Sequence, residues 1–230
     1  MRYYQIASLL LVPAVLLCTG CRRNPNISTE ANSLVDQWMA DETTAPKEPD
    51  HIAKNDIDDG AAASDSFEYS VTDGNVQIDK FTGKETDVTI SSHIGEYPVT
   101  AVGQYAFEAC WDVTSVTLPD SVQYIGEFAF MDCSSMTKIN IPEGVPALYR
   151  GTFAGCSSLT TVTLPASVAE TAEELFTGCP LTDLYIYNTD LTYMSWGLEE
   201  LEEPCTIHAP AGAAILTWAA ENGFPTEEIQ

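Results

Sequence analysis

Apolar and polar residues follow a pattern that repeats every 23 residues along residues 106–187. Each copy places a phenylalanine three residues before a cysteine, in the segments that start at Phe107, Phe130, Phe153 and Phe176. Each copy then contains a short stretch in which every second residue is apolar. Alternation with a period of two indicates a β-strand, and a repeat of this length predicts a solenoid. We therefore expect an α/β-type repeat solenoid with one short parallel β-strand per coil.

The apolar members of each alternating stretch should point into the coil, and the residues between them should point outward. The inward pairs are Val116/Leu118, Ile139/Ile141, Val162/Leu164 and Leu184/Ile186. Prolines follow three of these stretches, and each should end its strand because proline lacks an N–H donor. No single coil can bury its own apolar side, so stability depends on the stack.

The cysteines are spaced for burial rather than for cross-linking. The chain has seven cysteines, and four of them occupy the same slot of the repeat, at Cys110, Cys133, Cys156 and Cys179. Free cysteine is a small residue that is frequently buried. We expect these side chains to be core thiols, with vicinal disulfides or a metal site as the alternative.

The repeated segments resemble a known family. Residues 122–130 and 156–165, with their counterparts in the other copies, look like leucine-rich repeats of the BspA-like class over roughly residues 67–224. The resemblance implies a leucine-rich repeat solenoid with a concave parallel sheet, used for adhesion and binding on bacterial surface proteins.

The two ends of the repeat region depart from the pattern. Residues 67–105 are expected to form a lead-in, in which residues 87–90 make an incomplete first strand. Residues 106–187 hold the repeats and residues 188–230 a C-terminal cap. In the cap, a closing strand at residues 205–210 should precede a helix that opens at Pro210 and ends near Asn222.

The N-terminal segment has the layout of a bacterial lipoprotein signal. Arg2 precedes an apolar run from Ile6 to Leu17, which is too short to span a bilayer. The segment that ends at Cys21 resembles a lipobox, which implies a signal peptide at residues 1–20 and lipid on Cys21. Residues 21–66 are polar and acidic, so we expect a disordered tether. The alternative is an ordinary cleaved signal that releases a soluble protein.

The charge is strongly negative and uneven. The chain holds 9 Lys and Arg against 34 Asp and Glu, and residues 86–230 contain only two basic side chains, Lys138 and Arg150. Such a field disfavours nucleic acid and anionic polysaccharide as partners and favours basic partners, neutral partners or divalent cations. Solubility of an exported domain is the alternative explanation.

Two surfaces are candidates for binding a protein or glycan. The first is the outward side of the strands, comprising Ser115, Thr117, Lys138, Asn140, Thr161, Thr163, Asp183 and Tyr185. The threonines are equally explained by strand preference. The second is an aromatic patch of Tyr185, Tyr187, Tyr193 and Trp196, since such residues often anchor interfaces; its alternative role is packing of the cap. A nearby run of glutamates, 199–203, lacks the pattern of a calcium loop.

Catalytic motifs are not found in the sequence, so we expect no enzyme activity, no cofactor and no metal site. The leading hypothesis is a lipid-anchored protein, expected to be a monomer, that binds macromolecules outside the cell. The alternative is an envelope scaffold with a structural role. A third hypothesis, a docking relative of an enzyme, would require detectable turnover.

Overall fold

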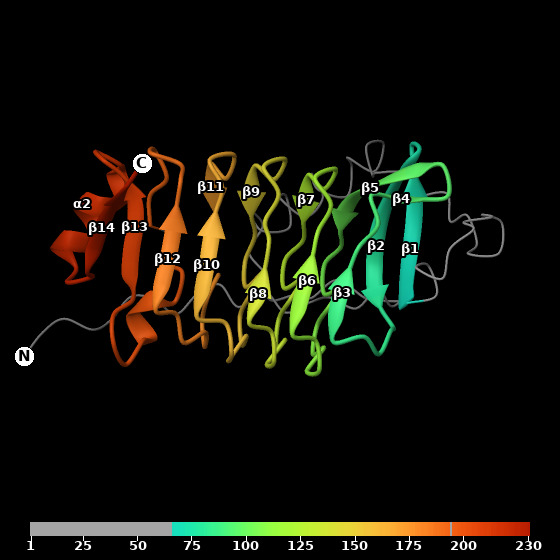
Figure 1. Cartoon of the computed structure of the whole chain (residues 1–230), viewed down its shortest axis with the longest axis horizontal. Helices are drawn as coiled ribbons and strands as arrows, with labels where there is room; N and C mark the ends of the chain where they lie inside the picture. The colour runs from blue at the N-terminus through green and yellow to red at the C-terminus, as the bar shows by residue number, and fades with distance from the viewer. Residues whose placement is uncertain (1–65, 194) are drawn as a thin grey trace, which may run out of the picture. The chain divides into compact units, whose positions relative to one another are not determined.

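The structure is a computed structural model that describes residues 66–193 and 195–230. The expected signal peptide at residues 1–20, the lipidated Cys21 and the tether up to residue 65 lie outside the described residues. The repeat unit consists of stacked coils whose strands lie side by side in two rows (Figure 1).

The lead-in forms a small sheet at the N-terminal end of the stack. Strands β1 (Phe67–Thr72) and β2 (Asn75–Phe81) pair antiparallel, and Thr72 faces Asn75 across a two-residue turn. Asp73 and Gly74 both have positive φ in this turn, at 50° and 73°, as a type I′ hairpin requires. Two further strands follow, β4 (His93–Ile94) and β5 (Tyr97–Val102), and β5 pairs parallel with β2. This sheet covers apolar side chains that the first coil would otherwise expose.

The first strand row confirms the strands expected from the repeat. It comprises β3 (Asp87–Thr89), β6 (Ser115–Thr117), β8 (Lys138–Ile139), β10 (Thr161–Leu164), β12 (Asp183–Ile186) and β13 (Thr206–Pro210). Neighbours pair parallel within two groups, β3-β6-β8 and β10-β12-β13. The central residues Val116, Val162 and Leu184 are buried, as the alternation predicts.

A second row of strands lies on the other side of the coils. Its members are the two-residue strands β7 (Tyr124–Ile125), β9 (Ala147–Leu148) and β11 (Glu170–Thr171). Strand β7 pairs parallel with β5, and β11 pairs parallel with β9. They recur at the step of 23 residues, as the repeat requires. Two residues are too few to produce an alternating pattern, so alternation along the sequence does not predict the strands of this row.

Between the two rows, the repeated phenylalanine and cysteine side chains stack along the interior. The ring centroids of Phe107, Phe130, Phe153 and Phe176 are 5.1–5.9 Å apart. The thiols of Cys133, Cys156 and Cys179 donate to the carbonyl of the phenylalanine in the coil before, at 3.1, 3.2 and 3.0 Å. All three are free and buried, so the expectation of core thiols is confirmed for them but not for Cys110.

Cys110 differs from the other repeat cysteines because no coil of the same kind precedes it. Its side chain is only half-buried, and its one sulfur contact is a 3.9 Å contact with the carbonyl of Glu108. Burial raises the pKa of Cys133 to about 12 and also raises the pKa of Cys110. These thiols therefore stay protonated near neutral pH.

The C-terminal cap corrects one expectation. Pro210 is the last residue of strand β13, and the helix α2 spans Ala214–Glu221, so the helix does not open at Pro210. The chain turns between the two at Gly212, whose φ is 80°, and the N–H of Ala213 donates to the carbonyl of Pro210. The closing strand and the end of the helix near Asn222 are confirmed.

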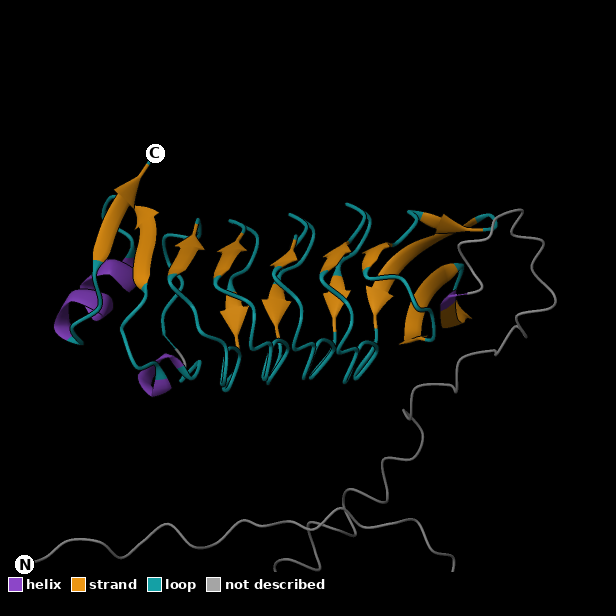
Figure 2. Cartoon of the chain, turned by 60° about the horizontal axis from the view of Figure 1, so that its bottom comes forward, coloured by secondary structure: helices purple, strands orange, loops and turns teal. Residues whose placement is uncertain are grey.

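A final strand, β14 (Thr226–Ile229), pairs parallel with β13 and ends the first row. Its residues are mostly exposed and polar, so they carry no alternation that would reveal a strand. Helix α2 buries Ile215 and Ala219 against the last coil, and Figure 2 shows this helix beside the terminal strands. In the part of the chain that the structure describes, no helix has the length and apolar character needed to cross a membrane.

Candidate functional site

The outward residues of the first strand row form one continuous surface, which we call the main face. Parallel register aligns them in two columns. One column contains Asp87, Ser115, Lys138, Thr161, Asp183 and Thr206, and the other contains Thr89, Thr117, Asn140, Thr163, Tyr185 and His208. Between β8 and β10, which are not paired, the 23-residue step continues both columns. Every strand residue that the sequence analysis assigned to the first candidate surface lies here, because the coils keep the same register along the stack.

Some polar side chains of the main face are hydrogen-bonded within the protein, and others are not. Ser115 donates to Asp87 at 2.7 Å, and this bond is the first cause of a lowered pKa of Asp87. The hydroxyls of Thr117, Thr161 and Thr163 have no side-chain partner within the described residues and are exposed. These three hydroxyls, together with that of Thr89, are available to a partner.

Asn140 has a structural use that the sequence did not reveal. Its side-chain oxygen accepts from the N–H of Leu118 at 2.8 Å, and its side-chain nitrogen donates to the carbonyl of Leu118 at 2.9 Å. The amide thereby replaces backbone pairing at the end of β8, which contains only two residues. Because both of its polar atoms are engaged, Asn140 contributes less to binding than its outward position implies.

At the C-terminal end of the main face, His208 is held between two carboxylates. Its Nε2 lies 2.8 Å from Asp183 Oδ1, and its Nδ1 lies 3.2 Å from Glu227 Oε2. A neutral imidazole carries a single N–H, so only the imidazolium donates to both partners. The bond to His208 is the first cause of a lowered pKa of Asp183.

Tyr185 completes this cluster, which we call the His208 cluster. Its ring lies parallel to the imidazole, with centroids 4.1 Å apart and planes 9° apart. The sequence analysis included Asp183 and Tyr185 in the candidate surface but missed His208. Alternation along Thr206, Ile207 and His208 was the signal that could have placed His208 on the same face.

The second candidate surface is not assembled as expected. Trp196 is fully buried, its ring packs edge-on against Phe176, and its N–H donates to Thr171 at 2.9 Å. The alternative given above, packing of the cap, therefore applies to Trp196. Tyr193 contacts Trp196 and Trp218 in the cap, whereas Tyr187 is exposed at the end of β12. The four aromatic residues do not form one patch.

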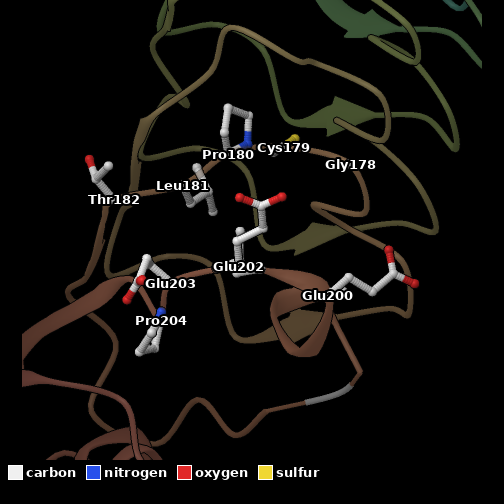
Figure 3. Close-up of a pocket in the computed structure, with 11 residues that line it drawn as sticks. Gly178, Cys179, Pro180, Leu181, Thr182, Glu200, Glu202, Glu203 and Pro204 are labelled. Carbon is white, nitrogen blue, oxygen red and sulfur yellow. The ribbon is translucent and has the colours of Figure 1, made fainter.

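Three of the glutamates in residues 199–203 line a cavity in the last coil. A short 3-10 turn at Leu198–Glu200 begins the segment, and Glu200, Glu202 and Glu203 line a cavity of about 560 Å³ beside Pro180 and Leu181. In Figure 3 the carboxylate of Glu202 lies beside Pro180 and Leu181, whereas the carboxylates of Glu200 and Glu203 point away from these side chains. Among the described residues, no group of three or more His, Cys, Asp or Glu is arranged to hold a metal ion.

The remaining histidines and cysteines do not assemble a nucleophile and base within the described residues. His93 is exposed and its Nδ1 lies 3.1 Å from the hydroxyl of Ser92, whereas His51 is outside the described residues. Burial raises the pKa of the Cys205 thiol to about 11, which disfavours the reactive thiolate.

Comparison with known proteins agrees with the coil structure. The profile of the BspA type leucine rich repeat region matches residues 80–196 in six copies. A leucine-rich repeat protein from Bacteroides capillosus is 30% identical, with a TM-score of 0.48, over 53% of this chain and 94% of its own. No curated protein sequence matches this chain significantly.

Two further solved structures share the fold at lower identity. A leucine rich cell surface protein from Faecalibacterium prausnitzii is 23% identical, with a TM-score of 0.56, over 73% of this chain and 43% of its own. The pneumococcal vaccine antigen PcpA is 15% identical, with a TM-score of 0.54, over 70% of this chain and 48% of its own. The profile covers just over half of the chain and coincides with the observed coils, so the chain belongs to the family of BspA-type leucine-rich repeat proteins.

Proposed function

We propose that this protein is a noncatalytic binding module of the bacterial cell surface, which recognises an extracellular protein or glycan through its main face. Leucine-rich repeat proteins generally serve as binding or structural modules rather than enzymes. The cell-surface description of the Faecalibacterium prausnitzii protein supports an exported location for this chain as well.

The observation that carries the proposal is the set of free hydroxyls on the main face. Thr117 lies in β6, and Thr161 and Thr163 lie in β10, so their hydroxyls belong to strands of one row. Their exposed hydroxyls can donate and accept hydrogen bonds, as recognition of a glycan or of a polar protein surface requires. Lys138 adds one cation in a region that is otherwise rich in carboxylates.

A variant that removes only these hydroxyls tests the proposal. The purified full-length chain is screened against extracellular matrix proteins, glycans and peptidoglycan fragments. The triple substitution Thr117→Val, Thr161→Val and Thr163→Val keeps the β-branched shape that strands favour. We expect it to weaken a hit about tenfold or more, at roughly 0.5–1.5 kcal/mol per lost hydrogen bond.

The matched control is Thr192→Val, which removes an exposed hydroxyl outside the first strand row. Equal binding by the triple variant and this control would exclude the main face as the binding surface. Silence across the whole screen would favour the structural role within the envelope.

Attachment to the membrane through lipid on Cys21 is part of the same proposal. Two acyl chains give a stable anchor, so the wild-type chain should remain with membranes after a high-salt wash. The substitution Cys21→Ser should release the protein, and protease added to intact cells should cut the anchored form. A Cys21→Ser protein that stays with washed membranes would contradict the lipid anchor.

A further inference from the structure

A cavity with aromatic walls lies in the C-terminal cap, away from the strands of the main face. Its volume is about 550 Å³, and it opens between the 3-10 turn and the end of α2. The walls carry the rings of Tyr193, Trp218 and Phe224, with Glu199 beside them. We call this cavity the cap cavity.

The three rings form a stacked series. Trp218 lies between the other two, with its ring centroid 3.9 Å from that of Tyr193 and 5.2 Å from that of Phe224. All three side chains remain partly accessible to solvent. The neighbouring rings cover the faces of Trp218, so this series offers an apolar wall against which the aliphatic stem of a long basic side chain can pack.

Glu199 adds a formal negative charge to the cap cavity. The hydroxyl of Tyr193 donates to its Oε2 atom, while Oε1 has no hydrogen-bond partner within the described residues. Burial, followed by this bond, raises the pKa of Tyr193, so the phenol stays protonated and continues to donate. The tyrosine therefore orients a carboxylate that keeps one oxygen available.

The acidic cavity described above adjoins the cap cavity. Leu201 and Pro204 line both cavities, and neither is lined by a basic side chain. Arg150 is paired with Glu174 at 2.8 Å, and Lys138 lies in β8. The other described basic residues, Lys80 and Lys84, lie in and just after β2 in the lead-in. The negative charge here is thus not neutralised by a neighbouring cation of the described chain.

We propose that the two adjoining cavities bind a basic peptide segment of a partner protein. One arginine or lysine of the segment lies against the rings and Glu199 of the cap cavity. A second basic side chain lies among Glu200, Glu202 and Glu203, while its apolar stem contacts Pro180 and Leu181. A peptide fits better than a small ammonium compound because it can place cations in both cavities at once. This site does not depend on the main face.

Three probes test the proposal with the full-length chain. The first is a fluorescein-labelled peptide in which three arginines alternate with glycines. The second is the same peptide with citrulline at each arginine position, which keeps the shape and removes the charge. The third is free arginine, used as a competitor. Fluorescence anisotropy should show that the arginine peptide binds, that the citrulline peptide does not, and that free arginine competes poorly.

Matched substitutions then locate the site. We expect Glu199→Gln to weaken binding of the arginine peptide about tenfold, since a charge-assisted contact is lost. Trp218→Leu should weaken it about threefold or more, because the aromatic wall of the cap cavity is lost. Glu143→Gln removes an exposed carboxylate of another coil and should change the affinity less than twofold.

Circular dichroism shows whether each variant is folded. Because Glu199 is exposed, Glu199→Gln should leave the cap intact, so it still tests the site if Trp218→Leu disturbs the cap. Equal loss in Glu199→Gln and Glu143→Gln would mean that only the overall charge attracts the peptide, which would overturn the proposal. Tight binding of free arginine, or failure of the peptide to bind at about 50 mM salt, would overturn it as well.

Discussion

At the scale of single residues, the position within the repeat determines whether a side chain is buried or exposed. Sequence reasoning is least accurate where the 23-residue step is interrupted. The slot shared by Cys133, Cys156 and Cys179 was predictable because four copies keep the same step. The hydrogen bonds from these thiols to neighbouring coils were not, because they depend on how coils stack. The sequence left Trp196 open between a binding patch and packing of the cap, because it follows Phe176 by 20 residues rather than 23.

One stability prediction belongs to this scale. Cys156 is fully buried and bonded to Phe130 of the preceding coil, so Cys156→Ala should lower the free energy of unfolding by about 1–2 kcal/mol. Cys110→Ala should cost less than about 0.5 kcal/mol, because its thiol is half-exposed and lacks such a bond. Urea denaturation followed by circular dichroism measures both. Equal losses would contradict the stacking role of the thiols.

At the scale of elements, alternation identified the first strand row, while pairing between neighbours explains what alternation could not. The second row has two-residue strands, and β14 has a mostly polar sequence, so both exist because an adjacent strand offers hydrogen bonds. The start of α2 was placed too early because proline suits the first helical position. Here Pro210 instead ends β13.

The His208 cluster contacts β14 through Glu227, and we expect acid to weaken the packing of β14 on this cluster. The lowered pKa of Asp183 means that its stabilising contribution is present above the pKa of an unfolded aspartate, about 3.9. This contribution is lost as the pH falls through the folded pKa and the carboxylate is protonated. We expect amide hydrogen exchange in residues 226–229 to accelerate below about pH 4, relative to the intrinsic rate at the same pH.

The substitution His208→Gln provides the comparison for this prediction. It removes the imidazole whose two nitrogens contact Asp183 and Glu227, so β14 should exchange faster at pH 7 and respond less to acid. Exchange in β1 and β2, at the opposite end of the stack, should not change. Identical protection of β14 in both proteins at every pH would exclude the cluster as the contact that holds this strand.

At the scale of the whole repeat unit, the frame was predictable from the sequence and the available surface was not. Register aligns Thr117, Thr161 and Thr163 on the main face as expected, but only the structure shows that Asn140 is occupied by backbone contacts. The excess of acidic residues predicted basic or neutral partners, and the peptide site proposed in the cap cavity would give that expectation a location.

The central claim is that a partner binds the main face, and hydrogen–deuterium exchange with a partner identified by the screen tests it most directly. Binding should slow exchange in β6 and β10 of the full-length chain, while β7, β9 and β11 of the second row exchange as before. Protection confined to the second row, or to neither row, would contradict the claim.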